Sequence, residues 1–169
     1  MVYKGEVWSK IPELVSDWGK RNVTRVFAGT FSHSLDGKGR VIIPAGFRDL
    51  LGSGFTIALN SSIDALALYP QEKWDAVNEQ LARVRDTDDE GMAYVRYIMA
   101  NAQTDMDMDA QGRVLVPANL REAAGITRDL TFVGMRDHIE LWDSAAFAEK
   151  ARIARENFAA LRRHVNETY

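Results

Sequence analysis

One segment occurs twice in this 169-residue chain, and this internal repeat constrains the fold more than any other feature of the sequence. The first copy, residues 34–52, reads SLDGKGRVIIPAGFRDLLG, and the second, residues 107–125, reads DMDAQGRVLVPANLREAAG. The similarity continues beyond the segment, because residues 55–74 parallel residues 130–147. The repeat therefore predicts two copies of one supersecondary unit that pack against each other.

Each copy begins with a turn and a short apolar strand. Gly39 and Gly112 stand where a tight turn needs a positive φ angle. The apolar runs 41–43 and 114–116 follow, and because they are unbroken we expect strands that are buried on both faces. A short helix should come next, between a proline that suits its first position and a glycine that suits its C-cap. These pairs are Pro44 with Gly52 and Pro117 with Gly125.

The rest of each copy predicts two further strands and a closing helix. The strands are expected at 55–59 and 65–69, and at 130–133 and 139–142. Apolar residues at helical spacing mark three helices, which we expect to make core or subunit contacts and not to hold a cofactor. They are Trp74, Val77, Leu81 and Val84 in the first copy, Met92, Val95, Ile98 and Met99 between the copies, and Phe147, Ala151, Ala154, Phe158, Leu161 and Val165 in one long helix of the second copy.

These elements divide the chain into four parts. Residues 27–86 form the first repeat, 87–103 a connecting helix, and 104–169 the second repeat with its C-terminal helix. Residues 1–26 lie outside the repeat, and we expect them to be a flexible arm or the product of a start codon assigned too far upstream. Because no linker rich in proline, glycine or serine separates the copies, we predict one compact body of two pseudo-equivalent lobes.

The composition argues against several classes of function. The chain has no cysteine, which removes disulfides, thiolate metal sites and cysteine nucleophiles. Its three histidines, His33, His138 and His164, show no ligand spacing, so we expect no metal, no cofactor, no small-molecule substrate and no enzyme activity. No apolar run is long enough for a membrane helix, and the N-terminus lacks the apolar core of a signal peptide. These features predict a cytoplasmic protein without membrane contact.

Two motifs imitate ligand-binding loops but depart from them at the decisive positions. Residues 105–112 begin like a calcium-binding EF-hand loop, yet Ala110 replaces the required glycine and Val116 the bidentate glutamate. The Gly37–Lys38 pair is similar to part of a phosphate-binding loop, but the full pattern G-x-x-x-x-G-K-[ST] does not occur in the chain. We therefore expect neither calcium binding nor nucleotide hydrolysis.

The charge balance limits how the chain could bind nucleic acid. A formal net charge of −3 argues against attraction over the whole surface, since phosphate binding needs clustered lysine and arginine. Any DNA site must therefore be local. An oligomer that repeats a small basic patch would bind DNA better than one copy of the chain, through multivalency.

The pattern D-x-x-x-R-[VIL]-x-[VIL]-P-x-x-x-R, present twice, resembles the SpoVT/AbrB-like DNA-binding superfamily. The two-copy form, with FAGTFSHSLDGKGR at residues 27–40, resembles the MraZ family. The resemblance implies an α+β fold of tandem duplicated swapped-hairpin β-barrel lobes with peripheral helices. It further implies a nucleoid-associated homo-oligomer, in ring form, that binds double-stranded promoter DNA at direct repeats ahead of its own division and cell-wall gene cluster.

The resemblance also assigns site residues. It places Arg40 and Arg113 on the DNA face, with Lys38 and Gln111 beside them. Residue chemistry agrees in part, because the arginine fork reads guanine edges whereas lysine makes a less directional phosphate contact. The turns themselves would be held by two aspartates, which would also orient the arginines, and by two glycines. These turn residues are Asp36 and Gly39 in the first copy and Asp109 and Gly112 in the second.

Alternative interpretations remain open at this stage. The aspartate and arginine of each turn could serve only to pin a hairpin. For Arg48 and Arg121, inside the short helices, we favour a salt bridge within the lobe or to a neighbour over DNA contact. The whole chain could instead be an AbrB-like partner-binding or assembly protein, similar to an antitoxin, without operator specificity. Salt-dependent, sequence-specific DNA binding would separate the two functions.

Overall fold

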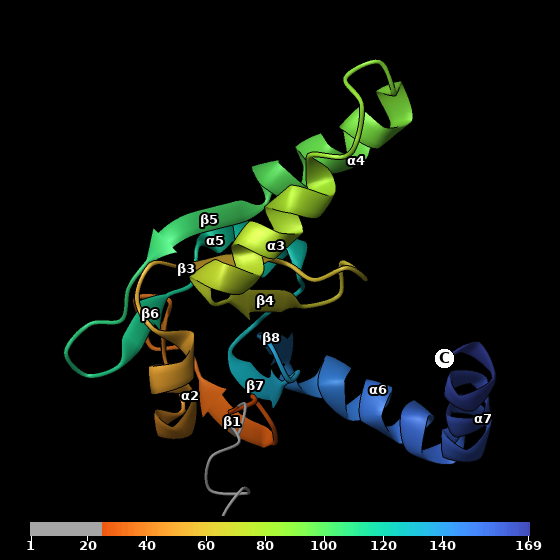
Figure 1. Cartoon of the computed structure of the whole chain (residues 1–169). Coiled ribbons are helices and arrows are strands. Elements are labelled where there is room, and N and C mark those ends of the chain that lie inside the picture. The colour runs from red at the N-terminus through yellow and green to blue at the C-terminus, as the bar shows by residue number, and fades with distance from the viewer. Residues whose placement is uncertain (1–24) are drawn as a thin grey trace, which may run out of the picture.

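The computed structural model describes residues 25–169 of the chain. The N-terminal extension, which the sequence predicts to be a flexible arm or a misassigned start, falls outside the described residues except for its last two. In the described part the chain alternates short strands and helices in an α+β fold (Figure 1).

The two copies contain the same series of elements, except that the second copy ends with an additional helix. The first copy has β1 (Thr30–Ser34), β2 (Arg40–Ile42), α2 (Ala45–Leu51), β3 (Phe55–Leu59), β4 (Leu66–Tyr69) and α3 (Gln71–Leu81). The helix α4 (Asp89–Ala100) connects it to the second copy. That copy has β5 (Ala102–Met106), β6 (Arg113–Leu115), α5 (Ala118–Ala123), β7 (Asp129–Gly134), β8 (Ile139–Asp143), α6 (Ser144–Glu156) and α7 (Phe158–Thr168).

The strand order shows that the two copies are interleaved. Six strands form one sheet in the order β1-β7-β8-β4-β3-β5, and β2 pairs with β6 in a separate two-stranded ribbon. The first strand of each copy thus pairs with the third strand of the other copy, antiparallel in both cases. Exchanging the copies reverses this order onto itself, so the chain has a pseudo-twofold axis between β4 and β8. The α+β class and the duplicated swapped-hairpin architecture are confirmed.

The interleaved strands share a single large hydrophobic core. Phe55 and Ile57 of the first copy and Phe132 and Leu141 of the second are all fully buried in the same cluster. A smaller cluster, built on Ala58, Trp74 and Ile98, packs the helices α3 and α4 against the sheet. Because the main core draws on both copies, neither copy can bury its apolar face alone.

The ribbon corrects one prediction about burial. The unbroken apolar run after each turn predicted strands buried on both faces, and this is wrong for the middle residue. Val41 and Val114 are buried, whereas Ile42 is 43% exposed and Leu115 is 51% exposed. The physical reason is that only one face of the β2–β6 ribbon packs on the core, so side chains alternate between core and solvent.

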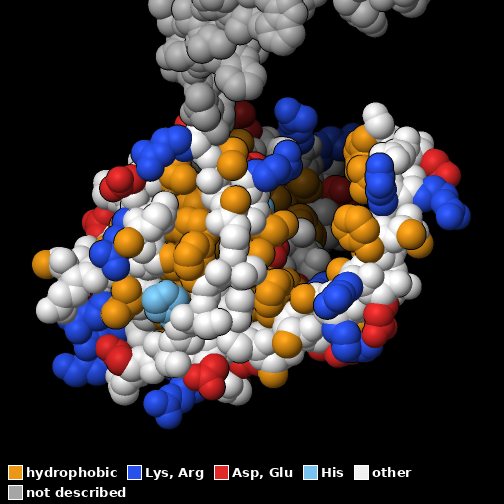
Figure 2. Space-filling view, turned by 90° about the horizontal axis from the view of Figure 1, so that it is seen from below, with side chains coloured by type: hydrophobic (Ala, Val, Ile, Leu, Met, Phe, Trp, Pro, Cys, Tyr) orange, Lys and Arg blue, Asp and Glu red, His pale blue; other side chains and the backbone are white. Residues whose placement is uncertain are grey.

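The C-terminal helical segment also differs from the prediction of one long helix. It is divided at Asn157, whose side-chain amide donates to the Ile153 carbonyl and caps α6, and α7 then turns back beside the end of α6 (Figure 1). A side-chain amide that bonds the preceding turn competes with helix continuation. Neither α6 nor α7 has a buried residue. Figure 2 shows apolar side chains exposed among charged ones on the surface of the molecule. Within residues 25–169, no helix is both long and apolar enough to cross a membrane.

Candidate nucleic-acid interface

Two equivalent turns lead into the strands of the ribbon. In each turn a glycine adopts a left-handed conformation, with φ of 76° at both Gly39 and Gly112. The Gly39 amide donates to the Asp36 carbonyl at 3.0 Å, and the Asp36 amide donates to the Arg40 carbonyl at 2.8 Å. The second copy repeats both bonds between its corresponding residues. The positive φ explains why glycine occupies this position, since other residues adopt it only at a cost.

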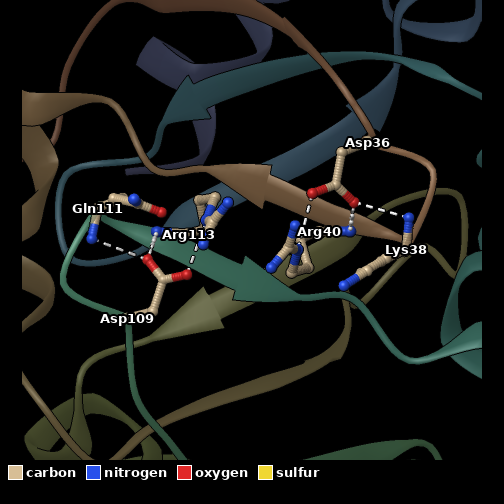
Figure 3. Close-up of polar contacts among 6 residues, drawn as sticks. All are labelled: Asp36, Lys38, Arg40, Asp109, Gln111 and Arg113. Carbon is tan, nitrogen blue, oxygen red and sulfur yellow. Dashed lines mark hydrogen bonds and ion pairs between the residues drawn. The ribbon is translucent and has the colours of Figure 1, made fainter.

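One aspartate holds each turn and its arginine together. Asp36 Oδ1 accepts hydrogen bonds from the backbone amides of Lys38 and Arg40, each at 2.9 Å, while Asp36 Oδ2 lies 2.7 Å from Arg40 Nε (Figure 3). Asp109 makes the same three contacts with Gln111 and Arg113 at the same distances. Both carboxylate oxygens are used, so the aspartate fixes the backbone of the turn and the direction of the guanidinium together.

These contacts also set the ionisation of the two aspartates. The hydrogen bond from the Arg40 backbone amide lowers the pKa of Asp36 below its ordinary value, and the amide of Arg113 lowers the pKa of Asp109 in the same way. A carboxyl group with a lowered pKa keeps its contacts above its ordinary range and loses them only as the pH falls through the lowered value. Both turns therefore carry ionised aspartates at neutral pH.

The ribbon brings the two turns into one site. Arg40 pairs with Leu115 and Ile42 pairs with Arg113 in the antiparallel register. Since side chains alternate along a strand and the middle pair is buried, these four side chains share the outer face. Figure 3 shows Arg40 and Arg113 close to each other over the ribbon, between the two aspartates. Six of the eight residues singled out in the turns thus lie at one surface, three from each copy, whereas the turn glycines Gly39 and Gly112 are buried.

Within residues 25–169, the arginines of the short helices bond to backbone carbonyls and form no salt bridge within their lobes. Arg48 Nε donates to the Ile43 carbonyl at 2.9 Å, and Arg121 Nε donates to the Val116 carbonyl at 3.1 Å. Within residues 25–169, neither arginine has a carboxylate partner among the ion pairs. The prediction of a structural role is compatible with this geometry, but the partner is a backbone carbonyl and not an acid.

Each of these arginines supports the turn of the other copy. A Cβ atom built on Gly39 would lie 3.1 Å from Arg121 Nη2, and one built on Gly112 would collide with the Arg48 guanidinium. The Gly112 carbonyl also accepts from the Ile43 amide at 2.8 Å, and the Gly39 carbonyl accepts from the Val116 amide at 3.0 Å. The glycines therefore serve the close approach of an arginine as well as the left-handed turn.

This packing makes a prediction for Gly112→Ala. The substitution should lower the free energy of unfolding by about 1–2 kcal/mol, because alanine is strained at this φ and its methyl group displaces Arg48. Urea denaturation would measure the change. Gly46→Ala in α2 is the matched control, since nothing lies within 4 Å of its added methyl group. The control should raise stability, as alanine favours a helix over glycine. An unchanged midpoint for Gly112→Ala would contradict the packing argument.

Sequence reasoning missed two features of this site. The exposure of Ile42 and Leu115 escaped notice because the apolar run hid an alternation that only the two-stranded pairing reveals. The crossed contacts of Arg48 and Arg121 join residues from different copies, and no local pattern signals them.

Within the described residues, no group of three or more histidine, aspartate or glutamate side chains could hold a metal ion.

The interleaved sheet and the paired aspartate–arginine turns define a duplicated swapped-hairpin protein that presents a two-stranded β-ribbon with two arginines on one face. The family model described as "MraZ protein, putative antitoxin-like" matches residues 26–95 and again residues 99–166. The chain belongs to the MraZ family, in agreement with the resemblance seen in the sequence.

Curated relatives from several bacteria support this assignment. The "Transcriptional regulator MraZ" of Desulfitobacterium hafniense (strain Y51) is 39% identical over 135 residues, which cover 80% of this chain and 93% of the relative. The protein of the same name from Lachnoclostridium phytofermentans is 41% identical, over 69% of this chain and 81% of the relative. That of Pediococcus pentosaceus is 37% identical, over 79% and 92%. The shared name is that of a regulator and not of an enzyme.

Proposed function

We propose that this chain is a sequence-specific DNA-binding transcriptional regulator and that the β2–β6 ribbon and its two turns form the DNA contact. The observation that carries the proposal is that both aspartate–arginine turns meet on one exposed ribbon. The major groove of B-DNA admits a two-stranded β-ribbon, and known β-ribbon proteins read DNA in this way. Double-stranded promoter DNA is therefore the proposed partner.

The turn residues then take distinct roles. Arg40 and Arg113 would read base edges, because each is tied to its aspartate through Nε and the planar guanidinium is held in a fixed direction. Lys38 would contact phosphate, and Gln111 occupies the same position in the second copy. The second turn lacks this lysine, so we expect its phosphate contact to be weaker than that of the first turn.

We also propose that the chain works as a homo-oligomeric ring. The C-terminal helices support this, because four large apolar residues of α6 and α7 are exposed: Ile153, Phe158, Leu161 and Val165. Three of these residues are spaced as one face of α7. A ring would repeat the ribbon around its circumference, which suits direct repeats in DNA and compensates for the net charge of −3. We place these repeats ahead of the chain's own division and cell-wall gene cluster, in the nucleoid.

Binding to a labelled fragment from just upstream of the gene, with scrambled DNA as competitor, tests this function. Wild-type protein should prefer the fragment, and Arg40→Ala should weaken specific binding by about fivefold to 150-fold, since a bidentate base contact contributes about 1–3 kcal/mol. Arg83→Ala, an exposed arginine outside the ribbon, is the matched control and should bind like wild type. Circular dichroism and sedimentation would verify that both variants keep fold and size.

The salt dependence separates this function from the alternative. Binding through phosphate contacts should weaken steeply as salt rises, since bound counterions are released from DNA. If the wild-type protein shows no preference for the fragment at low or moderate salt, the regulator proposal fails. The partner-binding or assembly function, similar to that of an antitoxin, would then be favoured.

A further inference from the structure

The two most exposed aliphatic side chains of the ribbon lie on the same outer face as its arginines. Ile42 and Leu115 are 43% and 51% exposed, whereas their strand neighbours Val41 and Val114 are buried. Ile42 faces Arg113 across the ribbon and Leu115 faces Arg40. The outer face therefore carries two arginines and two aliphatic residues, each aliphatic residue opposite an arginine.

A ligand that fits this outer face would place an apolar group against each aliphatic side chain and a polar group against each arginine. A large aliphatic side chain in water lacks the stabilisation that burial would give it, and both copies carry such a residue at the same position. In the major groove, the one apolar group on a base edge is the 5-methyl group of thymine, and it lies beside the polar edges that arginine reads. DNA with thymine next to the arginine-contacted bases would match this surface in both chemistry and order.

We infer that Ile42 and Leu115 are specificity-determining residues that recognise thymine methyl groups in the operator. The inference rests on the proposed function and adds a second kind of readout to it. Arg40 and Arg113 would select polar base edges, while the aliphatic pair would select thymine over cytosine and over unmethylated pyrimidines at neighbouring positions. A protein with the arginines alone would not distinguish thymine from uracil.

Replacing thymine by deoxyuridine tests this readout, because deoxyuridine keeps the base pairing and loses only the 5-methyl group. The probe is the upstream fragment synthesised with either base, and the full-length protein is titrated into both. Wild-type protein should bind the deoxyuridine fragment more weakly, by about fourfold for each methyl group that is contacted. Ile42→Ala with Leu115→Ala should bind the two fragments equally, and close to the wild-type affinity for deoxyuridine DNA.

Two controls make the result specific to the ribbon. Ile63→Ala removes an isoleucine of similar exposure, 48%, from the turn after β3, and this variant should keep the full preference for thymine. The double alanine variant should also sediment like wild type. A smaller assembly would assign the aliphatic pair to a subunit contact and would overturn the inference.

The remaining outcomes separate this inference from the proposed function. If the wild-type protein prefers the upstream fragment over scrambled DNA but binds its thymine and deoxyuridine forms equally, the inference fails and the proposed function stands. If the double variant loses as much affinity on deoxyuridine substitution as wild type does, the methyl groups act through DNA shape and the inference also fails. Absence of any preference for the upstream fragment would overturn both.

Discussion

A Leu161→Glu, Val165→Glu double variant is expected to break the proposed ring into single chains. Both residues lie on one face of α7 and are about half exposed, and Phe158 on the same face is 65% exposed. An isolated helix of this length is marginal in water, and proteins stabilise such helices by packing their apolar face. Two carboxylates placed in that contact would be buried without partners, at a cost that a subunit interface cannot offset.

The double variant should lose much of its affinity for DNA while the single chain keeps its folding stability. Linking several binding sites raises the overall affinity by about a hundredfold to ten-thousandfold, and this gain disappears when the chains separate. Light scattering would give the mass, and titration of the upstream fragment would give the affinity. Because α7 contributes no buried residue to the body of the chain, the variant should keep its thermal unfolding transition.

A charge-matched control separates the effect of losing the apolar face from the effect of adding negative charge. Ala159→Glu with Asn166→Glu also adds two negative charges to α7, but on the side away from the apolar face. This control should keep the wild-type mass and lose affinity only through weaker electrostatic attraction. If the control and the Leu161, Val165 variant have the same mass, the apolar face of α7 is not the subunit contact.

How far the sequence predicts the fold depends on whether a signal is local or crosses between the copies. The turns around Gly39 and Gly112, the short helices and the strands β3, β4, β7 and β8 all carry local signals, and the structure contains them. The strands β1 and β5 carry none, because their residues are mostly exposed and show no apolar alternation. Each of them pairs with the third strand of the opposite copy, so this exchange of strands follows only from the family resemblance.

The same distinction applies to the site. Asp36 and Arg40 are four residues apart, and their contact could be predicted from charge and turn chemistry alone. Gathering both turns on one ribbon depends on the pairing of β2 with β6, which joins residues far apart in the sequence. The break of the C-terminal helix at Asn157 was missed because the apolar spacing continues across it, while a single side-chain hydrogen bond ends α6.

The Asp36→Asn, Asp109→Asn double variant should lose sequence-specific binding although it removes two negative charges from a chain whose formal net charge is −3. Each aspartate accepts three hydrogen bonds with two oxygens, and asparagine offers only one oxygen, so it cannot hold both the turn and the arginine. A freed arginine must be ordered again on binding, which costs about 1.5–2 kcal/mol, or about tenfold to thirtyfold in affinity per turn. Because each chain has two such turns, the losses of affinity from both turns add.

Opposite signs of the two effects make this experiment decisive. If the aspartates acted only by their charge, removing two negative charges per chain would tighten binding to every DNA. If they orient the arginines, affinity for the upstream fragment falls while affinity for scrambled DNA rises, and the ratio of the two collapses. Asp137→Asn, which removes an aspartate paired with Lys73 at 2.7 Å outside the ribbon, is the matched control and should leave the ratio unchanged. If the double variant keeps the wild-type ratio of affinities for the upstream fragment and scrambled DNA, the aspartates play no part in recognition.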